Sequence, residues 1–210
     1  MEKTSQHPRT RRSSRAPRRA HILDVAAKVL AERGYRDTTM LEVARRSNAS
    51  KETLYAWFGD KLGLFEAVIR RNSGRIRLAL NGRLDGDTSV ESALTEFGRA
   101  LAFHLLCDNA VSINRAAISE ARSGPSLAGR VAKSGREPIQ RRFARYLQQC
   151  HERGVLFVED PDEAVETFVG LLFGSAQTLR LLGVIDAPGE SEIEHRAAQA
   201  VEKFLRLYGT

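Results

Sequence analysis

Hydrophobic residues recur every three or four positions along most of this chain, the spacing that collects them on one face of an α-helix. Near the N-terminus the pattern predicts a helix from about Pro17 to Gly34, because proline suits a first helical turn and glycine a helix end. A second long helix is predicted from its N-cap, Asp60, to about Leu80. Only 155–158 could form a strand, and it is too short and isolated to build a sheet. The pattern therefore predicts an all-α fold.

Two shorter helices are predicted between these long ones. Thr38 or Thr39 is an N-cap residue for the first, and Glu42, three positions after Thr39, completes a capping box. The segment 47–49 then interrupts the pattern, and Asn48 tolerates the left-handed backbone that a tight turn requires. The apolar face of this helix consists of Met40, Val43 and Ala44.

The second short helix covers about 51–58, and Ser50 is its N-cap. Leu54 and Phe58 lie on one side of it at i and i+4. Two short helices joined by a tight turn are the geometry of a helix-turn-helix, in which the second helix enters the DNA major groove by its N-terminal end. The side opposite Leu54 and Phe58 is polar and faces solvent, and it carries Lys51, Glu52, Tyr55 and Ala56.

The segment 34–65, GYRDTTMLEVARRSNASKETLYAWFGDKLGLF, resembles the DNA-binding domain of TetR-type transcriptional regulators. It departs from the family pattern at Asn48, where most members have glycine, and at Glu52, where a small residue is common. A positive φ angle tolerates asparagine, so the first departure keeps the turn. The positions that match the family are Gly34, Thr39, Val43-Ala44, 47–50, Thr53-Leu54-Tyr55, Phe58 and Asp60-Lys61.

The resemblance implies roles in DNA binding for single residues. Phosphate contacts are expected from Thr39, Tyr55 and Lys61, and Lys61 stands beside a helix N-terminus that also attracts anions. On the second helix a lysine can reach guanine and a glutamate can accept from cytosine. Tyr55 could instead be a core aromatic residue, and Trp57 could pack against the first long helix or lie at the DNA backbone. The residues expected at base edges or the groove wall are Lys51, Glu52, Thr53 and Ala56, and the predicted DNA-binding set also includes Ser50 and Trp57.

The turn-rich segment 81–89 marks a predicted domain boundary, and only helices are expected beyond it. This second half resembles, more loosely, the ligand-binding and dimerisation half of TetR-type regulators, at 118–121, 154–156, 160–161 and 171–174. Its helices are expected at 90–106, 110–121, 126–133, 137–153, 161–182 and 189–208. The chain is thus divided into a disordered basic arm (1–16), a DNA-binding domain with its connecting helix (17–80) and a ligand-binding and dimerisation domain (81–210).

Charge is distributed unequally between these parts. Residues 1–81 hold 18 Lys and Arg against 8 Asp and Glu, a net charge of +10, whereas 82–210 hold 15 against 18, a net charge of −3. A polyanionic partner, double-stranded DNA, is therefore expected for the first part only. The basic arm could lie along phosphates or in a minor groove, or it could be a solvated tail.

Composition and motifs do not favour an enzyme, a membrane protein or a metalloprotein. No apolar signal region or bilayer-spanning stretch is present, so a reducing cytoplasm is expected, with Cys107 and Cys150 as buried or partly buried thiols; a redox switch formed by the two is the alternative. His104 with Cys107, and Cys150 with His151, are pairs rather than complete zinc sites. No nucleophile elbow, phosphate loop or HExxH motif occurs, and no cofactor is expected.

These patterns predict a homodimeric repressor that a small apolar or amphipathic effector releases from its operator. The dimer is expected to form through the last two helices, whose apolar stripes (from Val165 to Phe173, extended by Leu179 and Leu182, and from Ile193 to Leu205) exceed what one chain could cover. The alternatives are a ligand-independent or nucleoid-type DNA-binding protein, and an enzyme or carrier with an incidental helix-turn-helix. Residues expected to line the effector pocket, unless they are plain core, are Phe97, Phe103, Leu106, Ile113, Phe143 and Leu147.

Overall fold

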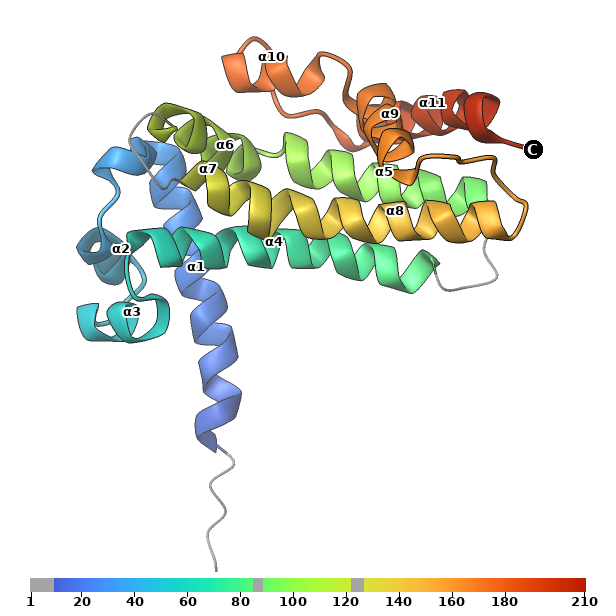
Figure 1. Ribbon diagram of the computed structural model, residues 1–210. Helices are drawn as coiled ribbons and strands as arrows, with labels where there is room; N and C mark the ends of the chain where they lie inside the picture. The colour runs from blue at the N-terminus through green and yellow to red at the C-terminus, as the bar shows by residue number, and fades with distance from the viewer. Residues whose placement is uncertain (1–9, 85–88, 122–126) are drawn as a thin grey trace, which may run out of the picture. The chain divides into compact units, whose positions relative to one another are not determined.

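The computed structural model describes residues 10–84, 89–121 and 127–210, and these are almost entirely helical (Figure 1). This confirms the predicted all-α fold. The chain separates into two compact units, one ending at Val68 and the other beginning at Ile69. The division lies inside the helix α4 (Lys61–Leu84), ahead of the boundary that the sequence pattern placed after residue 80. Residues 81–84, predicted to begin a turn-rich break, are still helical, and 85–88 lie outside the described residues.

The first unit consists of α1 (Thr10–Asp37), α2 (Met40–Arg46), α3 (Lys51–Phe58) and the beginning of α4. Gly34 has φ +74° and interrupts α1, as expected of a glycine that ends a helix. The core of the first unit is formed by the apolar faces of all four helices, whose buried residues pack against one another. These include Ile22, Leu23, Ala26, Val29, Leu30, Met40, Val43, Ala44, Leu54, Phe58, Leu64, Phe65 and Val68.

The start of α1 corrects the sequence prediction. The helix begins at Thr10, so residues 10–16, which were assigned to a disordered arm, are helical. Pro17 is inside the helix, where it removes one backbone hydrogen bond and its ring crowds the preceding turn. The guanidinium group of Arg15 lies 5.3 Å from the centre of the Trp57 ring, and that of Arg19 lies 5.1 Å from the Phe58 ring. Such cation–π contacts join residues about 40 positions apart, which local periodicity cannot reveal. Residues 1–9 of the predicted arm lie outside the described residues.

The second unit follows the predicted helices closely, with two differences. The segment expected as one helix at 126–133 is, from Leu127 on, a short α-helix followed by a π-helix, and residue 126 lies outside the described residues. The helix expected at 161–182 is broken at Gly174, where φ is +47°. The possible strand at 155–158 forms a single bridge, between Leu156 and Gly209. The elements are α5 (Val90–Leu106), α6 (Asp108–Glu120), α7 (Leu127–Arg130), the π-helix η1 (Val131–Arg136), α8 (Glu137–Glu152), α9 (Pro161–Phe173), α10 (Ala176–Leu182) and α11 (Glu190–Tyr208).

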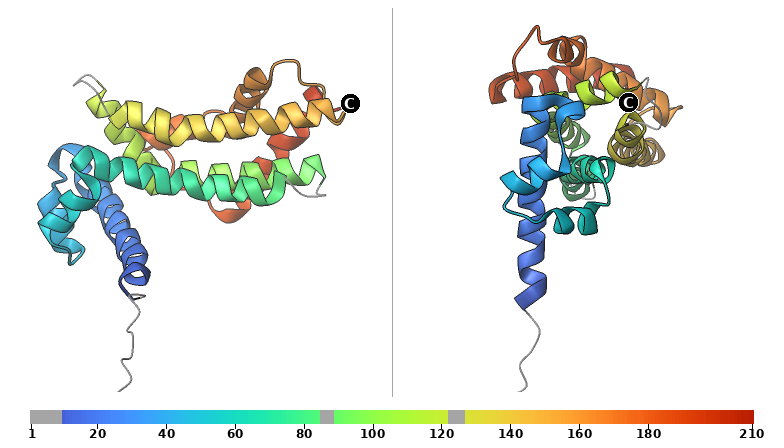
Figure 2. Two further views of the ribbon diagram at one scale, coloured as in Figure 1. Left: turned by 60° about the horizontal axis from the view of Figure 1, so that its bottom comes forward. Right: turned by 90° about the vertical axis from the view of Figure 1, so that its left-hand side faces the viewer.

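An aromatic cluster holds the second unit together. The ring of Phe97 on α5 lies 4.3 Å from that of Phe143 on α8 and 5.7 Å from that of Phe168 on α9, and Phe168 lies 5.4 Å from Phe204 on α11 (centroid distances). Accordingly, α9 and α11 pack on α5 (Figure 1), and α8 runs alongside the part of α4 that follows Ile69 (Figure 2).

This packing corrects one sequence prediction about the last two helices. Phe168, Leu172, Phe173, Val201 and Phe204 are all at most 3% exposed, because they face α5 and one another within a single chain. The apolar stripes proposed as a dimer surface therefore belong mainly to the protomer's own core. These segments still expose Leu182 (70%) and Leu207 (63%) beside polar residues.

Candidate nucleic-acid interface and ligand cavity

The N-terminus of α2 is fixed by two threonines with different tasks. Thr39 is the N-cap, and its Oγ1 accepts a hydrogen bond from the Glu42 backbone N–H at 3.2 Å. Thr38 is buried, and its hydroxyl donates to the Gly34 carbonyl oxygen at 2.7 Å. The predicted N-cap at Thr39 is thus present, and its side-chain oxygen is hydrogen-bonded to the first turn of α2.

The carboxylate of Glu42 is occupied by arginines of the same motif. Arg45 Nε donates to it at 3.2 Å and Arg46 Nε at 2.7 Å, and Arg33 lies 3.4 Å away. The hydrogen bonds from Arg45 and Arg46 lower the pKa of Glu42 to about 2. Arg46 also pairs with Glu32. These arginines therefore form an ion-pair network on the surface of α2, as expected of a solvated face.

The turn between α2 and α3 has the predicted conformation. Asn48 has φ +52°, and its carbonyl oxygen accepts a hydrogen bond from Arg18 Nη2 at 3.4 Å. The buried Ser47 hydroxyl donates to the Val43 carbonyl oxygen at 2.7 Å and so satisfies the end of α2. Ser50 Oγ accepts from the Thr53 N–H at 3.1 Å, which makes Ser50 the N-cap of α3. The angle between the two helices is thus set by local contacts.

Leu54 and Phe58 anchor α3, and its polar side faces solvent. Tyr55 is 46% exposed, so it is a surface residue and not a core aromatic. The Lys51 ammonium lies 5.7 Å from the centre of the Tyr55 ring. Hydrogen bonds from its own backbone N–H and from Ser50 lower the pKa of Glu52. Ala56 is exposed, and Thr53 and Trp57 are half-buried.

Lys61 is engaged within the first unit. Its Nζ donates to the Tyr35 carbonyl oxygen at 2.8 Å and to the Arg36 carbonyl oxygen at 3.3 Å, and it lies 4.3 Å from the centre of the Tyr35 ring. The sequence resemblance gave this lysine a phosphate contact, which stays a prediction. In the structure its ammonium group satisfies carbonyl groups at the end of α1.

The corner between α3 and α4 depends on a glycine that sequence reasoning did not single out. The Gly63 N–H donates to Asp60 Oδ1 at 2.7 Å, which confirms Asp60 as the cap of α4. A Cβ atom at Gly63 would lie 2.0 Å from the Phe58 carbonyl oxygen. Only glycine therefore fits here. Neither the spacing of apolar residues nor a capping pattern carries a signal for such a close approach.

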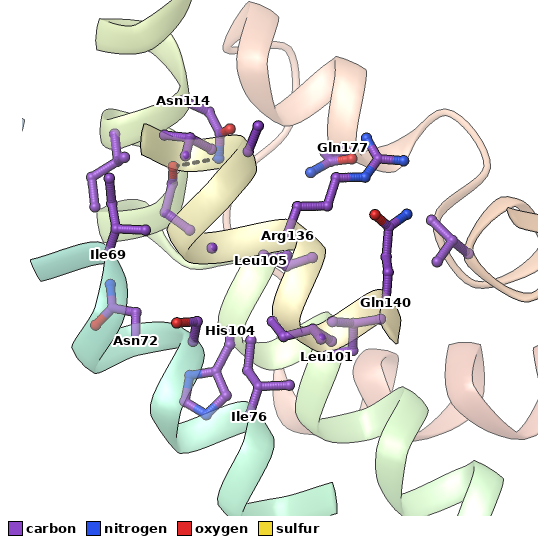
Figure 3. Close-up of a pocket in the computed structure, with 18 of the residues that line it drawn as sticks. Ile69, Asn72, Ile76, Leu101, His104, Leu105, Asn114, Arg136, Gln140 and Gln177 are labelled. Carbon is purple, nitrogen blue, oxygen red and sulfur yellow. Dashed lines mark hydrogen bonds between the residues drawn. The ribbon is translucent and has the colours of Figure 1, made fainter. Parts of the chain in front are cut away.

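A cavity of about 470 Å³ lies in the second unit, within the range typical of small-molecule sites (Figure 3). Helices α4 to α6, the segment from α7 through η1 to α8, and helices α9 and α10 all contribute to its wall, which is mostly apolar. The apolar lining includes Ile69, Ile76, Phe97, Leu101, Ile113, Ile139, Phe143, Val165, Val169 and Phe173. The polar lining consists of Asn72, Ser73, His104, Asn114, Arg136, Gln140 and Gln177.

Three of the six predicted pocket residues line this cavity: Phe97, Ile113 and Phe143. The structure does not place the other three there. Leu106 and Leu147 are at most 1% exposed in the surrounding core, and Phe103 is 58% exposed on the surface of α5. Helical spacing identifies apolar faces, but it does not tell which of them borders an empty space.

The two cysteines are in different surroundings. Cys107 is half-buried, and its thiol donates to the His104 carbonyl oxygen at 3.3 Å, while His104 itself lines the cavity. Cys150 is buried, and burial raises the pKa of its thiol. The neighbouring His151 accepts a hydrogen bond at Nδ1 from the Val158 N–H at 3.2 Å. Within 10–84, 89–121 and 127–210, no group of three or more His, Cys, Asp or Glu could hold a metal ion.

No helix in the described part of the chain is both long and apolar enough to cross a bilayer.

Comparison with known proteins gives the family. Residues 22–68 match the family described as bacterial regulatory proteins, tetR family, and residues 92–210 match the AefR-like transcriptional repressor, C-terminal domain. The chain belongs to the TetR family of DNA-binding transcriptional regulators, and its matched relatives are regulators rather than enzymes.

The similarity extends over nearly the whole length of both chains. The HTH-type transcriptional regulator YvkB of Bacillus subtilis (strain 168) is 28% identical over 188 residues, 89% of this chain and 96% of that protein. A TetR transcriptional regulator from Agrobacterium tumefaciens is 33% identical, with a TM-score of 0.74 over 93% of this chain and 96% of that one. The flavonoid-responsive regulator FrrA is 27% identical, with a TM-score of 0.67 over 92% and 97% of the two chains.

Proposed function

We propose that this TetR-family regulator is a homodimeric repressor that binds a near-palindromic operator and is released when a small molecule fills the cavity. The observation that carries the proposal is that α4 has residues in both units. This one helix contributes Leu64, Phe65 and Val68 to the core of the DNA-binding unit, and Ile69, Asn72, Ser73 and Ile76 to the cavity wall.

DNA recognition is assigned to the exposed side of α3. Lys51 and Glu52 stand in its first turn, where a recognition helix meets base edges, and they would set base preference. Tyr55 and Thr39 would contact phosphates and fix the position of α3 along the DNA duplex. Lys61 would add a phosphate contact if its ammonium group turns from the α1 carbonyls toward the backbone.

Effector binding is assigned to the cavity because a void of this size with an apolar wall and a few polar groups suits a small molecule. The flavonoid-responsive relative supports small-molecule control of this architecture. The effector must bind the DNA-incompetent state more tightly than the DNA-bound state, since equal affinity for both would shift nothing.

Dimerisation is assigned to the solvent-facing surfaces of α9 and α11, which carry the small residues Gly170 and Ala198. Small residues let helices from two protomers approach closely in a four-helix bundle. Replacing Gly170 by Arg should yield monomers with an intact fold, because a Cβ atom there meets nothing within 4 Å. Gly129→Arg, at another exposed position with equal space, is the matched control. Sedimentation that finds Gly170→Arg still dimeric would exclude this surface.

The proposed function as a whole is tested with an operator selected from a random duplex library. Fluorescence anisotropy should show one dimer bound per selected duplex, with binding weakened by at least one member of a panel of small apolar molecules. An affinity that no panel member changes would favour the ligand-independent alternative.

A further inference from the structure

The cavity has a polar end built from three separate elements. The side chains of Arg136 from η1, Gln140 from α8 and Gln177 from α10 extend to the same end of the lining, while Asn72 and His104 lie at the other (Figure 3). Arg136 is exposed, and Gln140 and Gln177 are half-buried, so the polar end is accessible to solvent. An apolar molecule that enters here would leave its polar group beside these side chains.

These three side chains have hydrogen-bonding capacity to spare. Among the residues that the structure describes, no carboxylate pairs with Arg136, and neither glutamine side chain makes a hydrogen bond. Other polar groups of the lining are used internally: Asn114 Nδ2 donates to the Ala110 carbonyl oxygen at 2.9 Å, and the Ser73 hydroxyl donates to two backbone carbonyls. Asn72, at the other end, likewise makes no side-chain hydrogen bond among the described residues, so what distinguishes the polar end is the positive charge of Arg136 beside two amides.

The local backbone places Arg136 on the cavity side. Val131, Ala132, Gly135 and Arg136 of η1 all line the cavity, whereas Lys133 in the same segment is exposed and lies outside the lining. π-Helical turns are rare and occur frequently at functional sites. Here the π-helical turn directs the guanidinium group of Arg136 and three small or apolar residues toward the cavity.

We propose that the effector of this regulator is an amphipathic organic acid, whose carboxylate is bound by Arg136 with Gln140 and Gln177 and whose apolar body lies among Phe97, Phe143 and Phe173. A guanidinium group holds a carboxylate by two parallel hydrogen bonds, and amide N–H groups can complete its coordination. An uncharged ligand of the same shape leaves the guanidinium unused and binds less tightly. The assignment rests on the proposed effector role of the cavity and narrows it to one chemical class.

Two matched pairs of probes test the headgroup: octanoate against 1-octanol, and 1-naphthaleneacetate against 2-(1-naphthyl)ethanol. Calorimetric titration of the full chain should show at least one acid binding on the order of tenfold or more tightly than its alcohol, as expected for a hydrogen-bonded charge. Arg136→Met should abolish this difference, Arg136→Lys should retain part of it, and Lys133→Ala should leave it unchanged. Thermal unfolding of the variants checks that each is folded.

The inference is overturned if the alcohols bind as well as the acids, if neither acid binds at about 1 mM, or if Arg136→Met leaves acid binding unaltered. Its failure is distinguishable from that of the proposed function. Acids that bind through Arg136 without releasing the operator would refute the repressor switch alone, whereas release by uncharged molecules only would refute the carboxylate site alone.

Discussion

The Ser73 hydroxyl donates a hydrogen bond to the Ser134 carbonyl oxygen at 2.9 Å and thereby joins α4 to the π-helix η1. One residue further along η1, a Cβ atom at Gly135 would lie 3.1 Å from Ile69 Cγ2, so the two elements also approach closely. Because η1 lines the cavity and contacts α4, which continues into the core of the first unit, the proposed effector would act on α4 by displacing η1.

Replacing Ser73 by Ala should weaken the response to effector. The buried hydroxyl bonds the carbonyls of Arg70 and Ser134, and its loss should lower the free energy of unfolding by about 1 kcal/mol. The ratio of operator dissociation constants with and without effector should also fall toward one. Ser119→Ala, which removes a bond within α6 alone, is the control. A wild-type ratio in Ser73→Ala would show that this contact does not transmit the signal.

Replacing Gly63 by Ala should disrupt the DNA-binding unit. The new methyl group would meet the Phe58 carbonyl oxygen at 2.0 Å, and relief requires a shift of the backbone between α3 and α4. The expected destabilisation is roughly 1–3 kcal/mol, measured by chemical denaturation, with a loss of operator affinity. Gly74→Ala in the same helix meets nothing within 4 Å and should be neutral or stabilising. Equal effects of the two substitutions would contradict the contact.

The ion pairs of Glu42 should make the free energy of unfolding depend on pH in the acid range, through the carboxylate of Glu42. Its folded-state pKa of about 2 is below the usual 4.5, so its contribution is present above pH 4.5 and is lost as the pH falls toward 2. The difference in free energy of unfolding between wild type and Glu42→Gln should be constant above about pH 5 and should shrink between pH 4.5 and 2. Denaturation curves at a series of pH values measure it. A difference that does not vary with pH would disprove the lowered pKa.

Tyr55 and Lys51 should affect DNA binding in different ways. Tyr55→Ala removes an expected phosphate contact and should weaken binding to every sequence by a similar factor. Lys51→Ala should instead change the preferred base at one position of each half-site, at a cost of about 1–3 kcal/mol for the original base. Competition assays on single-base operator variants separate the two effects. Lys28→Ala, at an exposed position of α1, should change neither.

The helix-turn-helix could be predicted from sequence because its contacts are local. Thr39 bonds the backbone three residues ahead, Ser50 does the same, and Asn48 takes the positive φ angle that its side chain permits. Such signals need no knowledge of the rest of the chain. The helices of the second unit were likewise visible in their periodicity, except at the π-helix η1 and where Gly174 interrupts one of them.

Features that depend on packing between distant residues could not be predicted in this way. An apolar stripe such as the one around Phe168 looks the same in the sequence whether its own chain or a partner chain covers it. The structure shows that α5 of the same chain covers it. Arg136 had no sequence signal, because a π-turn directs it to the cavity from a polar segment. The sequence around Arg15 is that of a basic tail, and it does not reveal the contact of Arg15 with the distant Trp57 ring.

The exposed side of α3 is expected to read a specific DNA sequence. The most direct measurement compares the affinity of the full chain for its selected duplex and for a scrambled duplex of the same composition, at about 0.15 M salt. We expect the selected duplex to bind about 10³-fold or more tightly. Equal affinity for the two duplexes would contradict sequence-specific regulation and would identify a general DNA-binding protein instead.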